Sequence, residues 1–254
     1  MKEPIPQQYT ELFHLLFLDQ LGRKLDKRAY ILKGGCNLRF YLKSIRYSED
    51  IDLDVRNLPK DKLQTVVENI LDSNPFEQIL QIRGLSISRW SAPKQTETTQ
   101  RWKLTLTVAG FEIPLHTKIE FSRRGLKKEP LFDPIDPSVI AEHQLSPIMV
   151  SHYDAHAAYE QKVEALVTRS TTQARDIFDL NLLLNTDVNR TVSDKTLRSL
   201  LSRAQANAMT ITFDIFKSQV LSFLHPDYRA QYDSESVWED IVLRVTEALS
   251  EEEP

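Results

Sequence analysis

Residues 46–55 of the chain, RYSEDIDLDV, alternate between acidic and branched apolar side chains from position 50 onward. Because residues two apart on a β-strand share a face, this alternation predicts a strand whose apolar residues at 51, 53 and 55 face a core. The opposite face would carry Asp50, Asp52 and Asp54. Neighbouring acids would stand roughly 6–7 Å apart and repel one another, and Asp is a poor strand former, so we expect positive charge to lie against them.

The acidic strand has more than one explanation. A half-buried edge strand with a solvated acidic face needs no ligand. A calcium loop of the EF-hand type is excluded, because Val55 stands where that loop needs glycine and because Ile51 and Leu53 stand where it needs polar residues. A magnesium site fits better, since Mg²⁺ prefers carboxylate oxygens and usually sits between one or two acids and substrate phosphates. Acids at the end of a strand can hold such ions for phosphoryl or nucleotidyl transfer.

A glycine pair, Gly34-Gly35, lies 15 residues upstream of the first acid, where a short strand over 29–32 is predicted to turn into a helix. Backbone N–H groups at a helix N-terminus bind anions, and glycine allows close approach. The pair matches neither a Walker loop nor a dinucleotide fingerprint, and most such pairs mark plain turns. A third acid is expected on a neighbouring strand, and Glu120 would supply it, although an isolated Glu in a strand is more often structural or solvated.

The periodicity of apolar residues divides the chain into an α/β part and a helical part. Residues 126–150 hold four prolines and no sustained period, so they predict a linker. The predicted fold class is α+β, with a mixed β-sheet flanked by helices in a domain over 1–125, the linker over 126–150, and an all-helical C-terminal domain over 151–254. The predicted elements are helices over 8–25 and from Pro59 to about Ser73, strands over 79–90, 102–109 and 111–121, and helices over 151–169, 174–185, 193–207, 212–224 and 236–250.

The composition is that of an ordinary folded protein, with 254 residues, 41% hydrophobic and 27% charged, and a net charge of −4. The charge is unevenly distributed: residues 23–46 hold eight basic side chains and one acid, and residues 236–254 hold six acids and one arginine. The basic stretch could hold phosphates or be a solvated helix face. Likewise, residues 123–128, RRGLKK, could guide an RNA or be a solvated loop.

No stretch of the sequence is apolar over the roughly 18 residues that a membrane span needs, and the start, MKEPIPQQYT, lacks the apolar segment of a secretory signal. We therefore expect a cytoplasmic protein with no membrane partner. The one cysteine, Cys36, cannot form an internal disulfide and is predicted to be a small packed residue.

The helical part contributes a second group of charged residues. Lys162 and Arg169 are seven residues apart, which places them on one helix face about 10 Å apart, either as a solvated pair or as phosphate contacts. In the next predicted helix, Asp176 and Asp179 share a face, and Asp179 could pair with Arg175 one turn away.

In combination, these motifs resemble those of the AbiEii nucleotidyltransferase-like toxins, a family of the DNA polymerase β-like nucleotidyltransferase superfamily. The resemblance runs from about Tyr30 to Leu184. It is carried by Gly34-Gly35, by Arg46-x-Ser48-x-Asp50-Ile-Asp52-Leu, by Lys118-Ile-Glu120, by Lys162-x-x-Ala165-Leu with Arg169, and by Arg175-Asp176-Ile-Phe-Asp179-Leu.

The resemblance implies a role for each matching residue and a nucleotidyltransferase-type sheet. Asp50, Asp52 and Glu120 would bind one or two Mg²⁺ ions and act in catalysis. Lys162 and Asp176 would be catalytic-site residues from the helical domain. Cys36 departs from the family, which often has a hydroxyl residue after the glycines. The residues implied to contact the nucleoside triphosphate (NTP) are Gly34, Gly35, Arg46, Ser48 and Arg169.

The activity implied by the resemblance is transfer of a nucleoside monophosphate (NMP) from an NTP to an RNA acceptor, in particular a tRNA 3′ end, by a toxin with a partner antitoxin. Two alternatives stay open: the same chemistry on a small-molecule or protein hydroxyl, and a catalytically inert binding module. The presence of all three acids speaks against the inert module.

Overall fold

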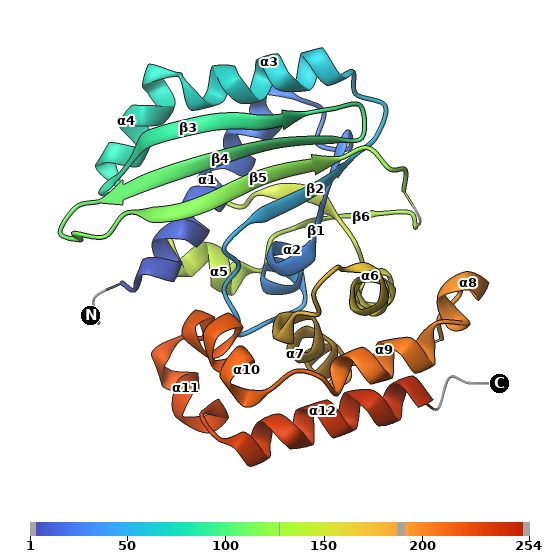
Figure 1. Cartoon of the computed structure of the whole chain (residues 1–254). Helices are drawn as coiled ribbons and strands as arrows, with labels where there is room; N and C mark the ends of the chain where they lie inside the picture. The colour runs from blue at the N-terminus through green and yellow to red at the C-terminus, as the bar shows by residue number, and fades with distance from the viewer. Residues whose placement is uncertain (1–3, 127, 187–190, 251–254) are drawn as a thin grey trace. The chain divides into compact units, whose positions relative to one another are not determined.

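The structure is a computed structural model that describes residues 4–126, 128–186 and 191–250. The chain forms two compact units, and most of their helices and strands are labelled in Figure 1. The N-terminal unit comprises Met1–Tyr41 and Tyr47–Tyr153, and the C-terminal unit comprises Leu42–Arg46 and Asp154–Pro254. Within the described ranges, no helix combines the length and the apolar character needed to cross a membrane.

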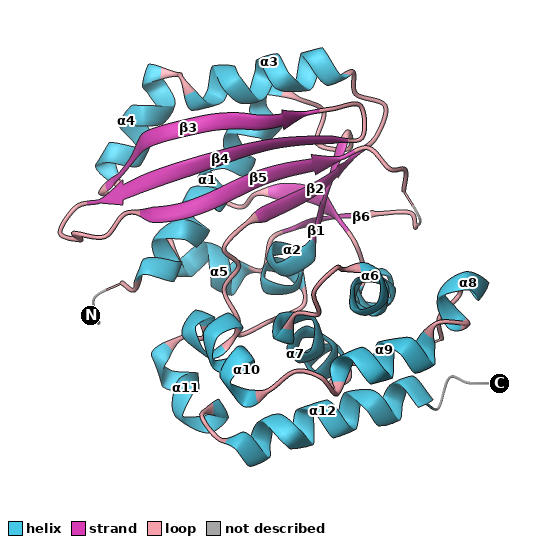
Figure 2. Cartoon of the chain, viewed as in Figure 1, coloured by secondary structure: helices cyan, strands magenta, loops and turns pink. Residues whose placement is uncertain are grey.

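A seven-stranded mixed sheet runs through the N-terminal unit in the order β3-β4-β5-β2-β1-β7-β6 (Figure 2). Strand β2 is parallel to β5 and antiparallel to β1, and β1 is parallel to β7. The other neighbours are antiparallel. The strands span Tyr30–Lys33 (β1), Ile51–Val55 (β2), Leu85–Gln95 (β3), Thr99–Val108 (β4), Leu115–Ser122 (β5), Leu131–Pro134 (β6) and Met149–His152 (β7).

Helices of the same unit pack against the sheet, and a groove over β3, β4 and β5 leaves part of one face open. Helix α1 packs against α3 and β5, and α4 packs against β3. Side chains alternate along a strand, so β4 buries Trp102 and Leu104 in the core while Lys103 between them is exposed. The helices of this unit are α1 (Pro6–Lys24), α2 (Gly34–Tyr41), α3 (Lys60–Leu71), α4 (Asn74–Ile82) and α5 (Pro137–Glu142). The predicted class, a mixed sheet flanked by helices, is confirmed.

The expected strand over 79–90 is partly wrong, because its first residues belong to helix α4. Ser73 caps this helix by accepting a hydrogen bond from the Phe76 amide, and a proline follows in the first turn. Both features favour a helix start. The chain then passes through Gly84, whose φ is +73°, before β3 begins at Leu85.

The stretch over 126–150, expected to be a linker, instead holds regular structure of the N-terminal unit. It contains β6, α5 and the start of β7. Its prolines fit these elements: Pro134 ends an edge strand and Pro137 opens a helix, two positions where proline is tolerated. The compact unit therefore continues to Tyr153.

In the C-terminal unit, the described residues form helices and loops, apart from one isolated bridge between Arg46 and Leu224. The segment expected as one helix over 193–207 is divided into α8 and α9. Helix α11 was not expected, because Pro226 reads as a break although it occupies the first helical turn. The elements are α6 (Ala155–Thr168), α7 (Ala174–Leu183), α8 (Lys195–Arg198), α9 (Leu201–Ala208), α10 (Phe213–Gln219), a 3₁₀ turn η1 (Leu221–Phe223), α11 (Pro226–Tyr232) and α12 (Glu235–Ser250).

Candidate active site

The sheet brings the three predicted acids of the N-terminal unit onto two neighbouring strands. Asp52 on β2 lies directly opposite Glu120 on the parallel strand β5, and Asp50 immediately precedes β2. Adjacent strands stand about 4.8 Å apart, so these carboxylates are close neighbours. The side chains of Asp50 and Glu120 are 24% and 23% exposed, which leaves both of them accessible to a ligand.

Cations of the protein lie against these acids, as the repulsion between the carboxylates requires. The Lys118 Nζ is 2.9 Å from Asp50 Oδ2 and 3.9 Å from Glu120 Oε2. Arg101 on β4 donates to Glu120 over 2.6 Å. Although burial alone would lower the pKa of Lys118, the Asp52 and Asp50 carboxylates raise it, so the amine stays charged. Sequence reasoning quoted Lys118 as part of a motif but gave it no role, although this lysine lies two residues from Glu120 and therefore on its face, and it did not name Arg101.

Asp54, the third acid of the alternating strand, has a separate structural role. Lys33 pairs with its Oδ1 over 2.5 Å, and the Tyr153 hydroxyl donates to its Oδ2 over 2.8 Å. Both of its oxygens are therefore engaged, and the residue is 8% exposed. This leaves Asp50 and Asp52 as the acids of the strand available for a ligand.

Asp52 differs from its neighbours, because its partly buried carboxylate forms no hydrogen bond or ion pair with another described residue. Burial raises the pKa of Asp52, and the Asp50 and Glu120 carboxylates raise it further, while Lys118 and Lys33 oppose the rise. A partly buried carboxylate without a partner is costly. A bound cation would remove this cost.

The glycine turn lies against the same carboxylate. Gly34 has a φ of +66°, which L side chains rarely adopt, and a Cβ placed there would stand 3.1 Å from Asp52 Oδ2. Gly35 follows in the first turn of α2. The amide-rich N-terminus of α2 and the acid therefore share one small region, as a triphosphate held by a cation requires.

A buried network fixes the backbone just before β2. The Thr117 hydroxyl donates to the Glu49 carbonyl over 2.7 Å and lies 2.7 Å from His14 Nε2. The Cys36 thiol donates to the Asp50 carbonyl over 3.3 Å. Burial lowers the pKa of His14 to about 4, so the ring is neutral near pH 7 and is free to share a proton within this network.

Two sequence expectations take a more precise form here. Cys36 is buried, as predicted for a small packed residue, and it also binds backbone. Ser48, implied to contact the triphosphate, donates its hydroxyl to the Asp50 carbonyl over 2.8 Å. Its role toward phosphate stays a prediction, while its contact in the structure positions Asp50.

The remaining predicted residues form one ion-pair cluster within the C-terminal unit. Lys162 Nζ lies 2.9 Å from Asp176 Oδ1 and 2.6 Å from Asp179 Oδ2. Arg169 Nε lies 2.8 Å from Asp176 Oδ2, so the two cations predicted to share a helix face do meet one carboxylate. Both aspartates are fully buried, and Arg169 is the most exposed cation of the cluster at 41%.

Arg46 belongs to the same cluster. It donates to Asp179 from Nε and Nη2 over 3.0 and 2.8 Å and is 4% exposed. Its implied contact with the triphosphate stays a prediction that would require this pair to open. Although burial alone would raise the pKa of Asp179, Arg46 and Lys162 hold it at about 2. Sequence reasoning had offered Arg175 as the partner of Asp179 and missed these two.

Another acidic group could be mistaken for a metal site. In the described part of the chain, Glu11, Glu142 and His143 are the group whose ligand atoms all lie within 4.8 Å of one another. However, the Arg39 guanidinium binds Glu11 over 2.7 Å and Glu142 over 3.2 Å. These acids are therefore already neutralised. Asp50, Asp52 and Glu120 do not form so close a group, so cation binding would require their side chains to converge.

A glycine turn at a helix start, an acidic strand and a further acid on its parallel neighbour, all on one mixed sheet, define the nucleotidyltransferase class. The chain matches the family described as "Nucleotidyl transferase AbiEii toxin, Type IV TA system" over residues 16–248. The chain belongs to this family, and it is a nucleotidyltransferase toxin of a type IV toxin–antitoxin system.

Solved structures resemble the fold at low sequence identity. JHP933 from Helicobacter pylori is 17% identical with a TM-score of 0.56, over 99% of this chain and 94% of that one. MenT4, a nucleotidyltransferase toxin from Mycobacterium tuberculosis H37Rv, is 16% identical with a TM-score of 0.61, over 95% of this chain and 82% of that one. A comparison with curated proteins finds no match.

Proposed function

We propose that the chain transfers an NMP from an NTP to the terminal hydroxyl of an RNA, in a reaction that depends on Mg²⁺, and that this reaction is the basis of its toxicity. The observation that carries the proposal is Asp52. This carboxylate has no described partner, lies opposite Glu120, and would stand 3.1 Å from a Cβ added at Gly34.

The chemistry of these residues fits a divalent cation. Asp50 and Asp52 would hold it, with Glu120 as the third acid, because all three are oxygen donors on adjacent backbone segments. When bound, Mg²⁺ neutralises charge on the triphosphate and polarises the transferred phosphoryl group. Lys118, now paired with Asp50, would then be released toward the phosphates as a second positive charge.

The residues of the chain position the reactants. The α2 N-terminus at Gly34-Gly35 offers backbone N–H groups to the triphosphate. The acceptor oxygen forms a bond to the α-phosphorus, the bond to the bridging oxygen breaks, and pyrophosphate leaves on the opposite side. The proton of the acceptor hydroxyl passes to a carboxylate of the acid cluster, for which Asp50 and Glu120 are the accessible candidates. Lys162, Asp176 and Arg169 stay predictions for the same reaction.

The choice of RNA as acceptor rests on charge. Four of the eight basic residues over 23–46 pair with acids of the protein, and the other four, Lys24, Lys27, Arg28 and Lys43, favour a polyanionic partner over a neutral hydroxyl compound. A partner antitoxin follows from the family, since a toxin of such a system is encoded with one.

The proposal is tested with each of the four NTPs, labelled on the α- or the γ-phosphate, incubated with total RNA and with or without Mg²⁺. We expect label in RNA from an α-labelled NTP only, with Mg²⁺ only, and none with Asp52→Asn. The matched control is Asp214→Asn, a change in an exposed ion pair of the C-terminal unit. Transfer of γ-label, or label on protein or on small molecules instead of RNA, would contradict the proposal.

A further inference from the structure

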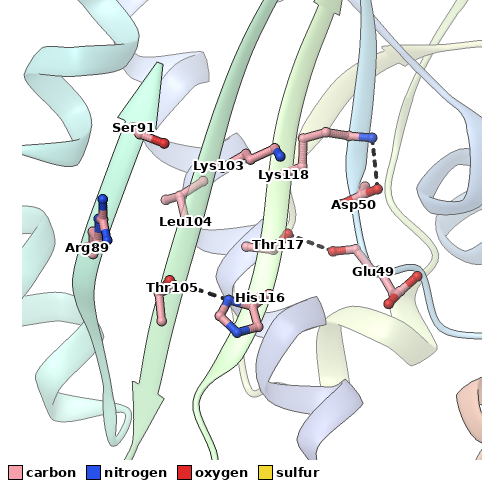
Figure 3. A pocket seen from close by; sticks show the side chains of 10 residues that line it. All are labelled: Glu49, Asp50, Arg89, Ser91, Lys103, Leu104, Thr105, His116, Thr117 and Lys118. Atoms are coloured by element: carbon pink, nitrogen blue, oxygen red, sulfur yellow. Dashed lines mark hydrogen bonds and ion pairs between the residues drawn. The ribbon is translucent and has the colours of Figure 1, made fainter. Parts of the chain in front are cut away.

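A groove of about 530 Å³ lies on the open face of the sheet, beside the acid cluster. Strands β3, β4 and β5 and the segment that leads into β2 supply its lining (Figure 3). Asp50 and Lys118 form one end of this basic groove, and it continues across the sheet over Lys103 to Arg89 and Ser91. It therefore joins the candidate active site directly.

The lining of the groove holds two acids, Glu49 and Asp50, both at the end near β2, and three cations, so the part over β3 and β4 is positively charged. Lys103 and Lys118 are directly opposite each other on β4 and β5, an arrangement of like charges that destabilises a sheet. Lys118 pairs with Asp50 and Glu120, but Lys103 and Arg89 have no ion-pair partner within the described ranges. Three cations on three adjacent strands span about 10 Å, a suitable length for more than one phosphate.

The strand order places this charge on a specific side of the acids. Counted across the sheet, the α2 N-terminus follows β1, the acids belong to β2 and β5, and the other groove cations belong to β4 and β3. The acids thus lie between two separate positive regions. In an in-line transfer the attacking and leaving oxygens lie on opposite sides of the phosphorus. If pyrophosphate leaves toward α2, the acceptor must approach from the basic groove.

We propose that the basic groove is the acceptor subsite and binds the phosphodiester backbone of the last nucleotides of an RNA, with the terminal hydroxyl at Asp50. The inference rests on the proposed function and specifies where its polyanionic substrate lies. Lys103 and Arg89 contact phosphate and carry no base specificity, because the phosphate groups are the same in every nucleotide. His116 and Ser91 are further donors along the groove.

The test uses Lys103→Gln, Arg89→Gln and the double variant, with Lys62→Gln as the matched control. All three positions are exposed, so the fold should be retained. Lys62 lies in the first turn of α3 and, like Lys103 and Arg89, has no described ion-pair partner. Binding of a fluorescent single-stranded RNA is measured by anisotropy over a range of salt concentrations, and KM is measured separately for RNA and for NTP.

Each lost phosphate contact lowers the slope of log K against log salt by about 0.7 for a single strand, so we expect the double variant to lose about 1.4. The KM for RNA should rise roughly tenfold in the double variant, with kcat and the KM for NTP unchanged, and Lys62→Gln should match the parent. If the parent protein transfers label to RNA but the double variant has an unchanged salt slope or a raised KM for NTP, the inference is overturned and the proposed function stands. If the parent transfers no label to RNA, both proposals fail together.

Discussion

Replacing Asp179 with asparagine removes the carboxylate that joins two buried cations of the C-terminal unit. Asp179 lies within 3.0 Å of both Arg46 and Lys162, and none of the three is more than 7% exposed. Asparagine keeps the shape of the side chain but carries no charge. The change therefore tests whether the cluster stabilises the unit by charge.

Two arguments give the size of the effect. Removing one partner of a buried ion pair typically costs about 3–5 kcal/mol, because the other charge is left uncompensated. The depressed pKa of Asp179, about 2 against an ordinary 3.8, corresponds to roughly 2 kcal/mol of stability. We therefore expect Asp179→Asn to lower the free energy of unfolding by about 3 kcal/mol. Because the pKa is depressed in the folded state, this contribution is present above pH 3.8 and is lost as the pH falls toward 2.

The assay is urea unfolding followed by ¹⁹F NMR of protein labelled with 5-fluorotryptophan. The three tryptophans include Trp238, which is buried in the C-terminal unit, while Trp90 and Trp102 report on the other unit. The control, Asp214→Asn, alters an exposed pair and should cost less than about 0.5 kcal/mol. A loss below about 1 kcal/mol for Asp179→Asn, or a loss that does not diminish in acid, would refute the assignment of charge compensation to this cluster.

Other predictions concern the N-terminal unit. Gly34→Ala should abolish NMP transfer and destabilise the protein by more than about 1 kcal/mol. The control is Gly110→Ala: Gly110 has a φ of +85°, but a Cβ added there meets no atom within 4 Å, so this variant should cost about 1 kcal/mol and retain activity. Equal effects of the two substitutions would count against the role of Gly34. Because the pKa of Asp52 is raised, the stabilisation from its protonated form is present below pH 3.8 and is lost as the pH rises through the folded pKa. The increase in Tm on adding Mg²⁺ should therefore grow with pH over that window, and an increase independent of pH would contradict it. Thr117→Val should lower kcat, because it removes the hydrogen bond to the Glu49 carbonyl just before β2, and Thr117→Ser, which keeps the hydroxyl, should retain the parent kcat. If Thr117→Val lowers only the stability, Thr117 has only a structural role.

The acid strand could be predicted because its information is local. Alternation fixed the faces of Asp50 and Asp52, and the apolar neighbours of Glu120 fixed its direction. The cations against these acids depend on which strands pair. Arg101 meets Glu120 only through the antiparallel register of β4 and β5, and local periodicity carries no such register.

The partners of Asp179 show the same limit over a longer range. Arg46 is 133 residues away along the chain, so no local spacing indicates the contact, whereas Arg175 one turn away was the obvious candidate. The prediction of a linker over 126–150 was wrong for a different reason. Prolines interrupt a pattern in the sequence, yet they are compatible with edge strands and with the first turn of a helix.

The central claim is that Asp50 and Asp52 bind the divalent cation beside Gly34. Its most direct test is a crystal of the protein with Mn²⁺ and a non-hydrolysable NTP, measured at the manganese absorption edge. We expect an anomalous peak within bonding distance of Asp50 and Asp52, with Lys118 moved from its present contact. A peak at Glu11, Glu142 and His143, or none beside Asp52 while the nucleotide is bound, would contradict the claim.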